Sequence, residues 1–191
     1  MSGIAIIDSG VGGLSIYQEI KKQLPDRQYI FVSDNQAFPY GTKPEKELKK
    51  RVFEIVERVI AQFQPELIVI ACNTASTVVL PPLRERFELP IVGVVPAIKP
   101  AAQLTKTNVI GLLATPATIA RVYTDQLIKD FAPNCDVIKV GSSRLVEIAE
   151  DKLNDRPVDI DQIKAEIQPL IDSNKMDTLV LACTHFPLLN K

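Results

Sequence analysis

Two thiols in this chain stand at the ends of apolar, β-branched runs and are followed at once by small polar side chains. Residues 67–71 (LIVIA) lead into Cys72, and residues 178–182 (TLVLA) lead into Cys183. A strand buried in a parallel sheet is apolar along its whole length, and its carboxyl end opens into the crevice where such sheets bind ligands. The repeated arrangement predicts that the two thiols belong to two halves of one site.

A pair of opposed thiols suits one chemistry in particular, which is removal of a proton from one face of a stereocentre and return of a proton to the other face. Each group is then a base in one direction and an acid in the other. A cysteine thiol has an ordinary pKa of about 8.5, and helix N-termini and nearby donors lower it, so thiol and thiolate are both accessible near neutral pH. Main-chain N–H groups and hydroxyls could hold the substrate carboxylate without a metal or cofactor.

Other interpretations of the cysteines stay open. Either thiol alone is equally consistent with inert packing, because free Cys is often buried as a small hydrophobe. Cys135 lacks the polar context and is interpreted as structural. A nucleophilic Cys183 with His185 as its base would suit acyl transfer, but residues so close in sequence seldom present their side chains to each other, and Cys72 is left without a role. A redox dithiol would require disulfide geometry.

A glycine-rich turn near the N-terminus is a second candidate for ligand binding. Residues 8–13 (DSGVGG) follow the short apolar run 4–7 and precede a helical pattern over residues 14–24. Glycines permit close backbone approach, and a helix N-terminus favours an anionic group. The spacing is not the G-x-G-x-x-G fingerprint of dinucleotide binding. Asp8 is equally consistent with a turn cap and with a carboxylate of the site.

Strand and helix patterns alternate along the chain, which predicts parallel sheets built from βαβ units. Strands are expected at residues 4–7, 29–32, 67–71, 90–96, 108–114, 136–140 and 179–182, and helices at 14–24, 45–63, 77–87, 119–131, 142–153 and 159–171. The prolines at 81–82 weaken the prediction of a single continuous helix there. The predicted class is α/β with two similar domains, each a mostly parallel sheet flanked by helices, and an active site in the cleft between them. The first domain is placed at residues 1–95, with Cys72, and the second at 96–191, with Cys183.

Composition excludes several classes of protein. The chain has 191 residues, a net charge of −1, three Cys and one His, so nothing points to a nucleic-acid or membrane-surface partner. No apolar run approaches the ~20 residues that span a bilayer, and the N-terminus lacks the features of a secretory signal. An odd Cys count without CxxC spacing argues against a disulfide framework and a zinc site, and for a reducing, cytoplasmic compartment.

The predicted helix over residues 45–63 is amphipathic, with its apolar residues at helical spacing. Its basic residues fall on the other face. We interpret the cluster of Lys46, Lys49, Lys50 and Arg51 as a solvated surface and not as a nucleic-acid patch.

Five segments resemble, in the same order, motifs of the bacterial glutamate racemases, the cofactor-independent members of the aspartate/glutamate racemase superfamily. They are residues 8–14 (DSGVGGL), 39–41 (PYG), 71–76 (ACNTAS), 111–118 (GLLATPAT) and 182–189 (ACTHFPLL). Each is weak evidence alone, but five in order over essentially the whole chain are specific. The opening glycine turn favours the glutamate branch over the aspartate branch.

The resemblance implies interconversion of L- and D-glutamate without cofactor or metal, in supply of D-glutamate for peptidoglycan. It implies that Cys72 abstracts the proton of D-glutamate and Cys183 that of L-glutamate, with Asp8 and His185 as auxiliary residues. Positions that line the substrate pocket match Ser9, Pro39, Tyr40, Gly41, Asn73, Thr74, Thr115, Thr118 and Thr184. Glu150 matches a family glutamate less closely. The segment around it resembles the branch of the family that a peptidoglycan precursor activates.

One departure from the family pattern concerns the C-terminus. Family members usually continue past the 182–189 motif with a strand and helices that complete the first domain, whereas this chain stops at Lys191. An uncovered sheet edge and face are therefore expected, which favour instability or association, for example into a homodimer. The alternatives are a weakly active or inactive fragment that acts only by binding an amino acid or by regulation, and an aspartate racemase.

Overall fold

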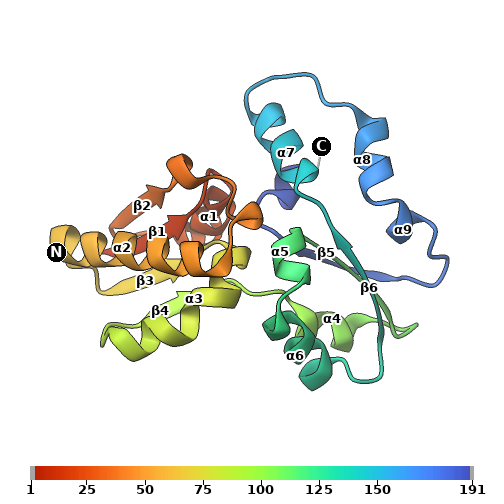
Figure 1. The fold of residues 1–191 in the computed structure, drawn as a ribbon, viewed down its shortest axis with the longest axis horizontal. Coiled ribbons are helices and arrows are strands. Elements are labelled where there is room, and N and C mark those ends of the chain that lie inside the picture. The colour runs from red at the N-terminus through yellow and green to blue at the C-terminus, as the bar shows by residue number, and fades with distance from the viewer. Residues whose placement is uncertain (1–2, 190–191) are drawn as a thin grey trace. The chain divides into compact units, whose positions relative to one another are not determined.

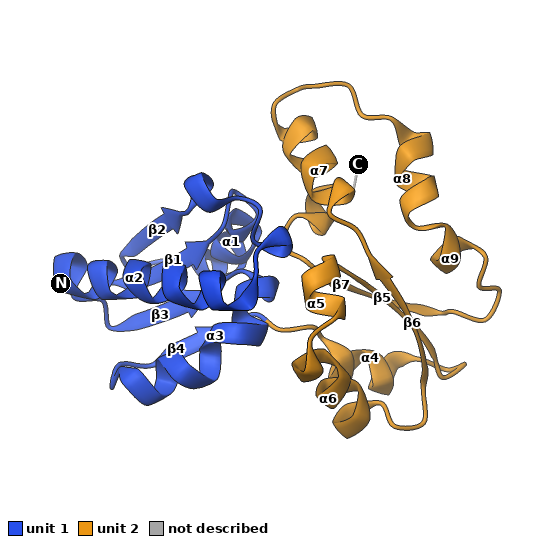
Figure 2. Ribbon diagram, in the orientation of Figure 1, with its two compact units in different colours: residues 1–94 blue, residues 95–191 orange. Residues whose placement is uncertain are grey.

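The computed structural model describes residues 3–189. The chain divides into two compact units, residues 1–94 and 95–191, which Figure 2 shows in different colours. Each unit contains one sheet of parallel strands with helices packed against it (Figure 1). The predicted α/β class, with two mostly parallel sheets flanked by helices, is confirmed.

The first unit has a sheet with the strand order β2-β1-β3-β4. Its strands are β1 (Ile4–Asp8), β2 (Tyr29–Ser33), β3 (Leu67–Ile70) and β4 (Ile91–Gly93), and its helices are α1 (Gly13–Gln23), α2 (Glu45–Phe63) and α3 (Asn73–Arg86), with short 3-10 helices η1 (Asn35–Ala37) and η2 (Tyr40–Thr42). Alternate side chains of a strand point to opposite faces, so Ile4 and Ile6 pack against Ile16 and Ile20 of α1. Figure 1 shows α2 and α3 on the other side of this sheet.

Helix α3 differs from its prediction in two ways. It begins at Asn73, four residues before the predicted start, and it continues through Pro81 and Pro82. Proline cannot donate a main-chain hydrogen bond, so the helix loses two internal bonds at this point. Its buried side chains, among them Val79 and Leu83, hold it against the sheet instead. The proline pair weakened the prediction of one continuous helix, but it does not interrupt α3.

The second unit has a sheet with the strand order β6-β5-β7. Its elements are α4 (Ile98–Leu104), β5 (Val109–Ala114), α5 (Pro116–Ile119), α6 (Val122–Phe131), β6 (Asp136–Gly141), α7 (Arg144–Leu153), α8 (Ile160–Glu166), α9 (Gln168–Ile171), β7 (Thr178–Ala182) and η3 (Phe186–Leu189). Two helices that were predicted as continuous are each divided. Residue Arg121 is extended between α5 and α6, and Pro169 stands in the first turn of α9, where its missing N–H costs nothing.

The two sheets repeat one topology around a central strand. In each unit the first strand lies between the second and the third, so β3 and β7 hold equivalent places beside β1 and β5. Ile70 near the end of β3 is level with Ile7, and Ala182 is level with Ala114. Because all these strands are parallel, the residues that follow β1 and β3 gather at one edge of the first sheet, and those that follow β5 and β7 gather at one edge of the second.

Some apolar side chains on the outer strands of the two sheets are exposed. Val92 on β4 is 48% exposed, and Leu179 and Leu181 on β7 are 44% and 41% exposed. The first sheet has two edge strands, β2 and β4, and each is paired on one side only within the described chain. Over residues 3–189, no helix is both long enough and apolar enough to cross a membrane.

Candidate active site

The first unit places a buried carboxylate at the end of β1. Asp8 is fully buried, and its Oδ2 accepts a hydrogen bond of 2.7 Å from the main-chain N–H of Gly13, the first residue of α1. The carboxylate therefore holds the glycine-rich turn against the strand. Ser9, the next residue, is 4% exposed. Both residues stand at the edge of the sheet where the sequence predicted half of a site.

Gly13 is required here by close packing and not by a left-handed backbone. A Cβ atom at this position would lie 2.7 Å from Asp8 Cβ and 3.2 Å from Ala71 Cβ. These atoms are next to the main chain and cannot rotate away. We expect Gly13→Ala to displace the Asp8 carboxylate and to lower the free energy of unfolding by about 1–3 kcal/mol, measured by urea denaturation.

The matched control for this prediction is Gly12→Ala. Gly12 has φ −54° and ψ −37°, ordinary helical angles that Ala adopts freely. A loss of stability that is equal in the two variants would show that the contact between residue 13 and Asp8 is not the cause.

Cys72 lies between β3 and α3, where the strand gives way to the helix. Its side chain is 7% exposed, and its carbonyl accepts a hydrogen bond of 2.9 Å from the N–H of Ser76. The Ser76 hydroxyl donates to the carbonyl of Ile70 at 3.0 Å and so ties the helix start to the strand end. Asn73 and Thr74, both buried, form the first turn of α3. A helix N-terminus favours negative charge, which suits a thiolate at this position.

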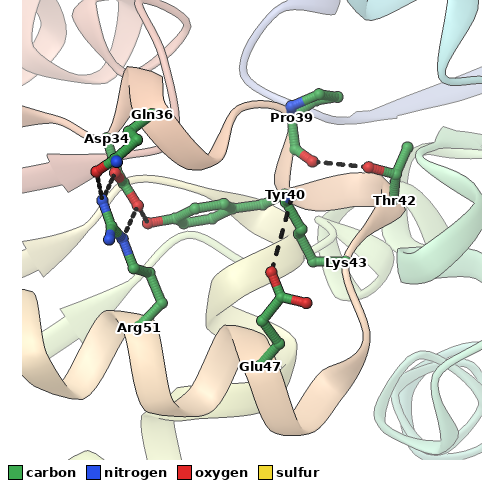
Figure 3. Close-up of polar contacts among 8 residues, drawn as sticks. All are labelled: Asp34, Gln36, Pro39, Tyr40, Thr42, Lys43, Glu47 and Arg51. Carbon is green, nitrogen blue, oxygen red and sulfur yellow. Dashed lines mark hydrogen bonds and ion pairs between the residues drawn. The ribbon is translucent and has the colours of Figure 1, made fainter.

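The loop at residues 39–41 is anchored by a buried ionic network (Figure 3). The Tyr40 ring is 1% exposed, and its hydroxyl donates to Asp34 Oδ2 at 2.8 Å. Arg51 of α2 donates to the same carboxylate through Nε at 2.8 Å and through Nη2 at 2.6 Å. Thr42 donates its hydroxyl to the carbonyl of Pro39 at 3.1 Å and so closes the loop.

This network corrects one interpretation of the sequence. Lys49 and Lys50 do lie on the surface of α2, paired with Glu45 and Glu54. Arg51 does not belong to that solvated surface, because its guanidinium binds a carboxylate whose side chain is 4% exposed. A buried charge requires a partner, and Arg51 supplies it.

The second unit places a thiol, an imidazole and a carboxylate in a row. His185 Nδ1 lies 3.9 Å from Cys183 Sγ, and His185 Nε2 lies 2.9 Å from Glu150 Oε1 of α7. Cys183 is 8% exposed and His185 is 2% exposed. The expectation that Cys183 and His185 would not present their side chains to each other was therefore wrong, because the chain turns immediately after β7.

Threonines complete the second half. Thr115 caps α5, since its Oγ1 accepts the N–H of Thr118 at 3.3 Å, and the two hydroxyls lie 3.0 Å apart. Thr124 of α6 donates its hydroxyl to the carbonyl of Thr118 at 2.6 Å and so fixes this turn. Thr184, between Cys183 and His185, is 4% exposed. Thr115 and Thr118 follow the carboxyl end of β5 and Thr184 follows that of β7, where the sequence placed them.

The predicted residues thus fall into two groups, one in each unit. The first unit holds Asp8, Ser9, Pro39, Tyr40, Gly41, Cys72, Asn73 and Thr74, and the second holds Thr115, Thr118, Glu150, Cys183, Thr184 and His185. Sequence reasoning missed Asp34 and Arg51. One signal was present, because Asp34 directly follows β2 at the same edge of the sheet as Asp8.

Two parallel sheets that each carry a buried thiol just beyond the equivalent strand define a two-unit α/β protein. The family model described as Asp/Glu/Hydantoin racemase matches residues 4–191. The chain belongs to this family.

Individual relatives agree with that assignment. The glutamate racemase of Pectobacterium atrosepticum is 54% identical over 187 residues, which cover 97% of this chain and 66% of the relative, so the chain spans about two thirds of its length. The crystal structure of Escherichia coli glutamate racemase in complex with L-glutamate and the activator UDP-MurNAc-ala has a TM-score of 0.93 and 51% identity, covering 99% of this chain and 72% of that one. The Francisella tularensis glutamate racemase in complex with D-glutamate has a TM-score of 0.83 and 29% identity, covering 98% and 70%.

Proposed function

We propose that this protein interconverts L- and D-glutamate by proton transfer at the α-carbon, with Cys72 and Cys183 as the two acid–base groups. The observation that carries the proposal is the equivalent position of the two thiols, each buried just beyond the third strand of a parallel sheet. Membership of the Asp/Glu/Hydantoin racemase family supports it. So does the 54% identity to a glutamate racemase.

The reaction proceeds in two proton transfers. The Cys183 thiolate removes the α-proton of L-glutamate, which leaves a carbanion-like centre whose charge spreads into the adjacent carboxyl group. The Cys72 thiol then donates a proton to the opposite face, which yields D-glutamate and a Cys72 thiolate. The reverse reaction exchanges the two roles. Asp8 and His185 act as auxiliary groups that supply and accept protons beside the two thiols.

Hydroxyl, amide and main-chain donors of the two groups hold the substrate in this proposal. These donors belong to Ser9, Tyr40, Gly41, Asn73, Thr74, Thr115, Thr118 and Thr184. Pro39, which has no N–H, lines the pocket, and Glu150 is an auxiliary group behind His185. The structures of relatives in complex with L-glutamate and D-glutamate support glutamate as the substrate, and the one that contains UDP-MurNAc-ala supports activation by a peptidoglycan precursor. We place the reaction in the cytoplasm, where thiols stay reduced and D-glutamate is needed for peptidoglycan.

Proton NMR in deuterated buffer tests this function directly. The chain is incubated with L-glutamate, and separately with L-aspartate, with and without UDP-MurNAc-ala and with no cofactor. We expect the α-proton signal of glutamate to disappear while D-glutamate accumulates, faster in the presence of the activator. Aspartate is expected to remain unchanged.

The other outcomes separate the alternatives. Inversion of aspartate but not of glutamate would assign an aspartate racemase. Loss of the α-proton without inversion would mean that only one thiol works. No exchange by protein with a cooperative thermal transition would overturn the racemase assignment and leave an amino-acid-binding or regulatory role.

A further inference from the structure

Asp34 is a buried carboxylate that the proposed proton transfers do not use. It follows β2, its side chain is 4% exposed, and it accepts three hydrogen bonds, two from Arg51 and one from Tyr40. Figure 3 shows the guanidinium of Arg51 and the hydroxyl of Tyr40 converging on it from different elements. An Arg guanidinium that binds both carboxylate oxygens fixes orientation as well as charge.

The ionisation of this network is well defined. Burial alone would raise the pKa of the Asp34 carboxyl, but the hydrogen bonds from Arg51 and Tyr40 outweigh burial and hold that pKa below its ordinary value. Burial, the bond to Asp34 and the negative charges of Asp34 and Cys72 raise the pKa of Tyr40 above its ordinary range. The network is therefore a guanidinium, a carboxylate and a neutral phenol that acts as donor. Removal of Arg51 would leave the carboxylate buried without its counter-charge.

The network is joined to both strand ends that carry the first half of the site. The N–H of Asp34 donates to the carbonyl of Asp8 at 2.9 Å. On the other side, η2, which contains Tyr40, contacts α3, the helix that begins directly after Cys72. Movement of the Tyr40 ring would therefore move the loop at residues 39–41 relative to the thiol.

We propose that Arg51 is a positioning residue for racemisation, which acts through Asp34 to lock the Tyr40 ring and hold the loop at residues 39–41 in place beside Cys72. The inference rests on the proposed function, in which this loop binds substrate. The proposed proton transfers do not use Arg51 itself. Its guanidinium is partly exposed, with the side chain 34% exposed, and it also donates to Gln36 Oε1 at 3.0 Å. Arg51 therefore acts by fixing the orientation of the Asp34 carboxylate through two hydrogen bonds.

The test compares Arg51→Met with Lys50→Met, which removes the same charge from the neighbouring residue of α2. The Lys50 side chain is 80% exposed, and its replacement removes an ion pair with Glu54 whose charged atoms lie 3.9 Å apart. For Arg51→Met we expect kcat/KM for both enantiomers to fall about 10- to 100-fold, with most of the change in KM, because a displaced loop weakens substrate binding. Lys50→Met is expected to match the wild type. Arg51→Lys keeps the positive charge but cannot form the two parallel hydrogen bonds of the guanidinium. It is therefore expected to recover only part of the loss.

A double-mutant cycle shows whether Arg51 acts through the tyrosine. Tyr40→Phe removes only the hydroxyl that binds Asp34. If the loop is held by way of this bond, the double variant Arg51→Met/Tyr40→Phe is expected to be no worse than Arg51→Met alone. If the losses of kcat/KM in the two single variants add fully in the double variant, Arg51 does not act through the Tyr40 hydroxyl. If Arg51→Met fails to fold, the same cycle is made with Arg51→Lys.

Failure of this inference differs from failure of the proposed function. A lower melting temperature of Arg51→Met with unchanged kcat and KM, while the wild type and Lys50→Met racemise glutamate, would reduce Arg51 to a purely structural role and overturn this inference alone. A folded wild-type chain and Lys50→Met that both lack racemase activity would overturn the proposed function, and this inference with it.

Discussion

Cys72→Ala and Cys183→Ala are each expected to lower kcat/KM for glutamate racemisation by about 10⁴-fold or more, in both directions. In the proposed mechanism each thiol is the base for one enantiomer and the acid for the other, so neither direction proceeds with one thiol. The reaction in deuterated buffer gives a sharper result than the rate. Cys72→Ala is expected to retain α-proton exchange with L-glutamate, because Cys183 can still remove that proton and return deuterium to the same face. Cys183→Ala is expected to retain exchange with D-glutamate only.

The matched control is Cys135→Ala. Cys135 is partly buried at the edge of the core of the second unit, and its replacement is expected to leave both racemisation and exchange at the wild-type level. Proton NMR measures exchange, and chiral chromatography measures inversion. Inversion that persists in either active-site variant at more than a small fraction of the wild-type rate would contradict the two-thiol mechanism. Exchange of the opposite enantiomer would reverse the assignment of the two thiols.

His185→Asn is expected to lower kcat/KM by about 10²-fold, because the imidazole that lies 3.9 Å from Cys183 Sγ no longer assists proton transfer there. Enantiomers have equal free energies, so the equilibrium constant is one and kcat/KM must fall equally in both directions. The discriminating measurement is the isotope effect with glutamate deuterated at the α-carbon. Transfer at Cys183 becomes slower than transfer at Cys72, so the effect is expected to rise for L-glutamate and to fall for D-glutamate.

Glu150→Gln tests the same group of residues by a smaller change. The amide oxygen can still accept a hydrogen bond from His185 Nε2, which lies 2.9 Å from the carboxylate, but the negative charge is removed. We therefore expect a smaller loss of kcat/KM, with the same asymmetry of isotope effects. Equal isotope effects for the two enantiomers in His185→Asn would contradict a role for the imidazole at Cys183.

Local patterns in the sequence determined most of the secondary structure. The apolar run at residues 4–7 predicted a strand buried on both faces, and it lies in the centre of the first sheet. Helix α2 spans residues 45–63 as predicted, because Pro44 precedes it and its buried residues recur at helical spacing. The placement of Cys72 and Cys183 at strand ends followed from the same reasoning, since an apolar run that gives way to polar residues marks the carboxyl end of a strand.

Only the tertiary structure decided which distant side chains meet. Arg51 and Asp34 are 17 residues apart, and His185 and Glu150 are 35 apart, so their contacts depend on how α2 and α7 pack against their sheets. The start of α3 was also a tertiary result. Residues 73–76 precede the helix predicted from residue 77, and three of them are polar. They are nevertheless buried and helical, because Ser76 binds the end of β3 and the surrounding core covers them. Periodicity reports how each segment folds locally, whereas these contacts arise from packing between segments, which no local pattern encodes.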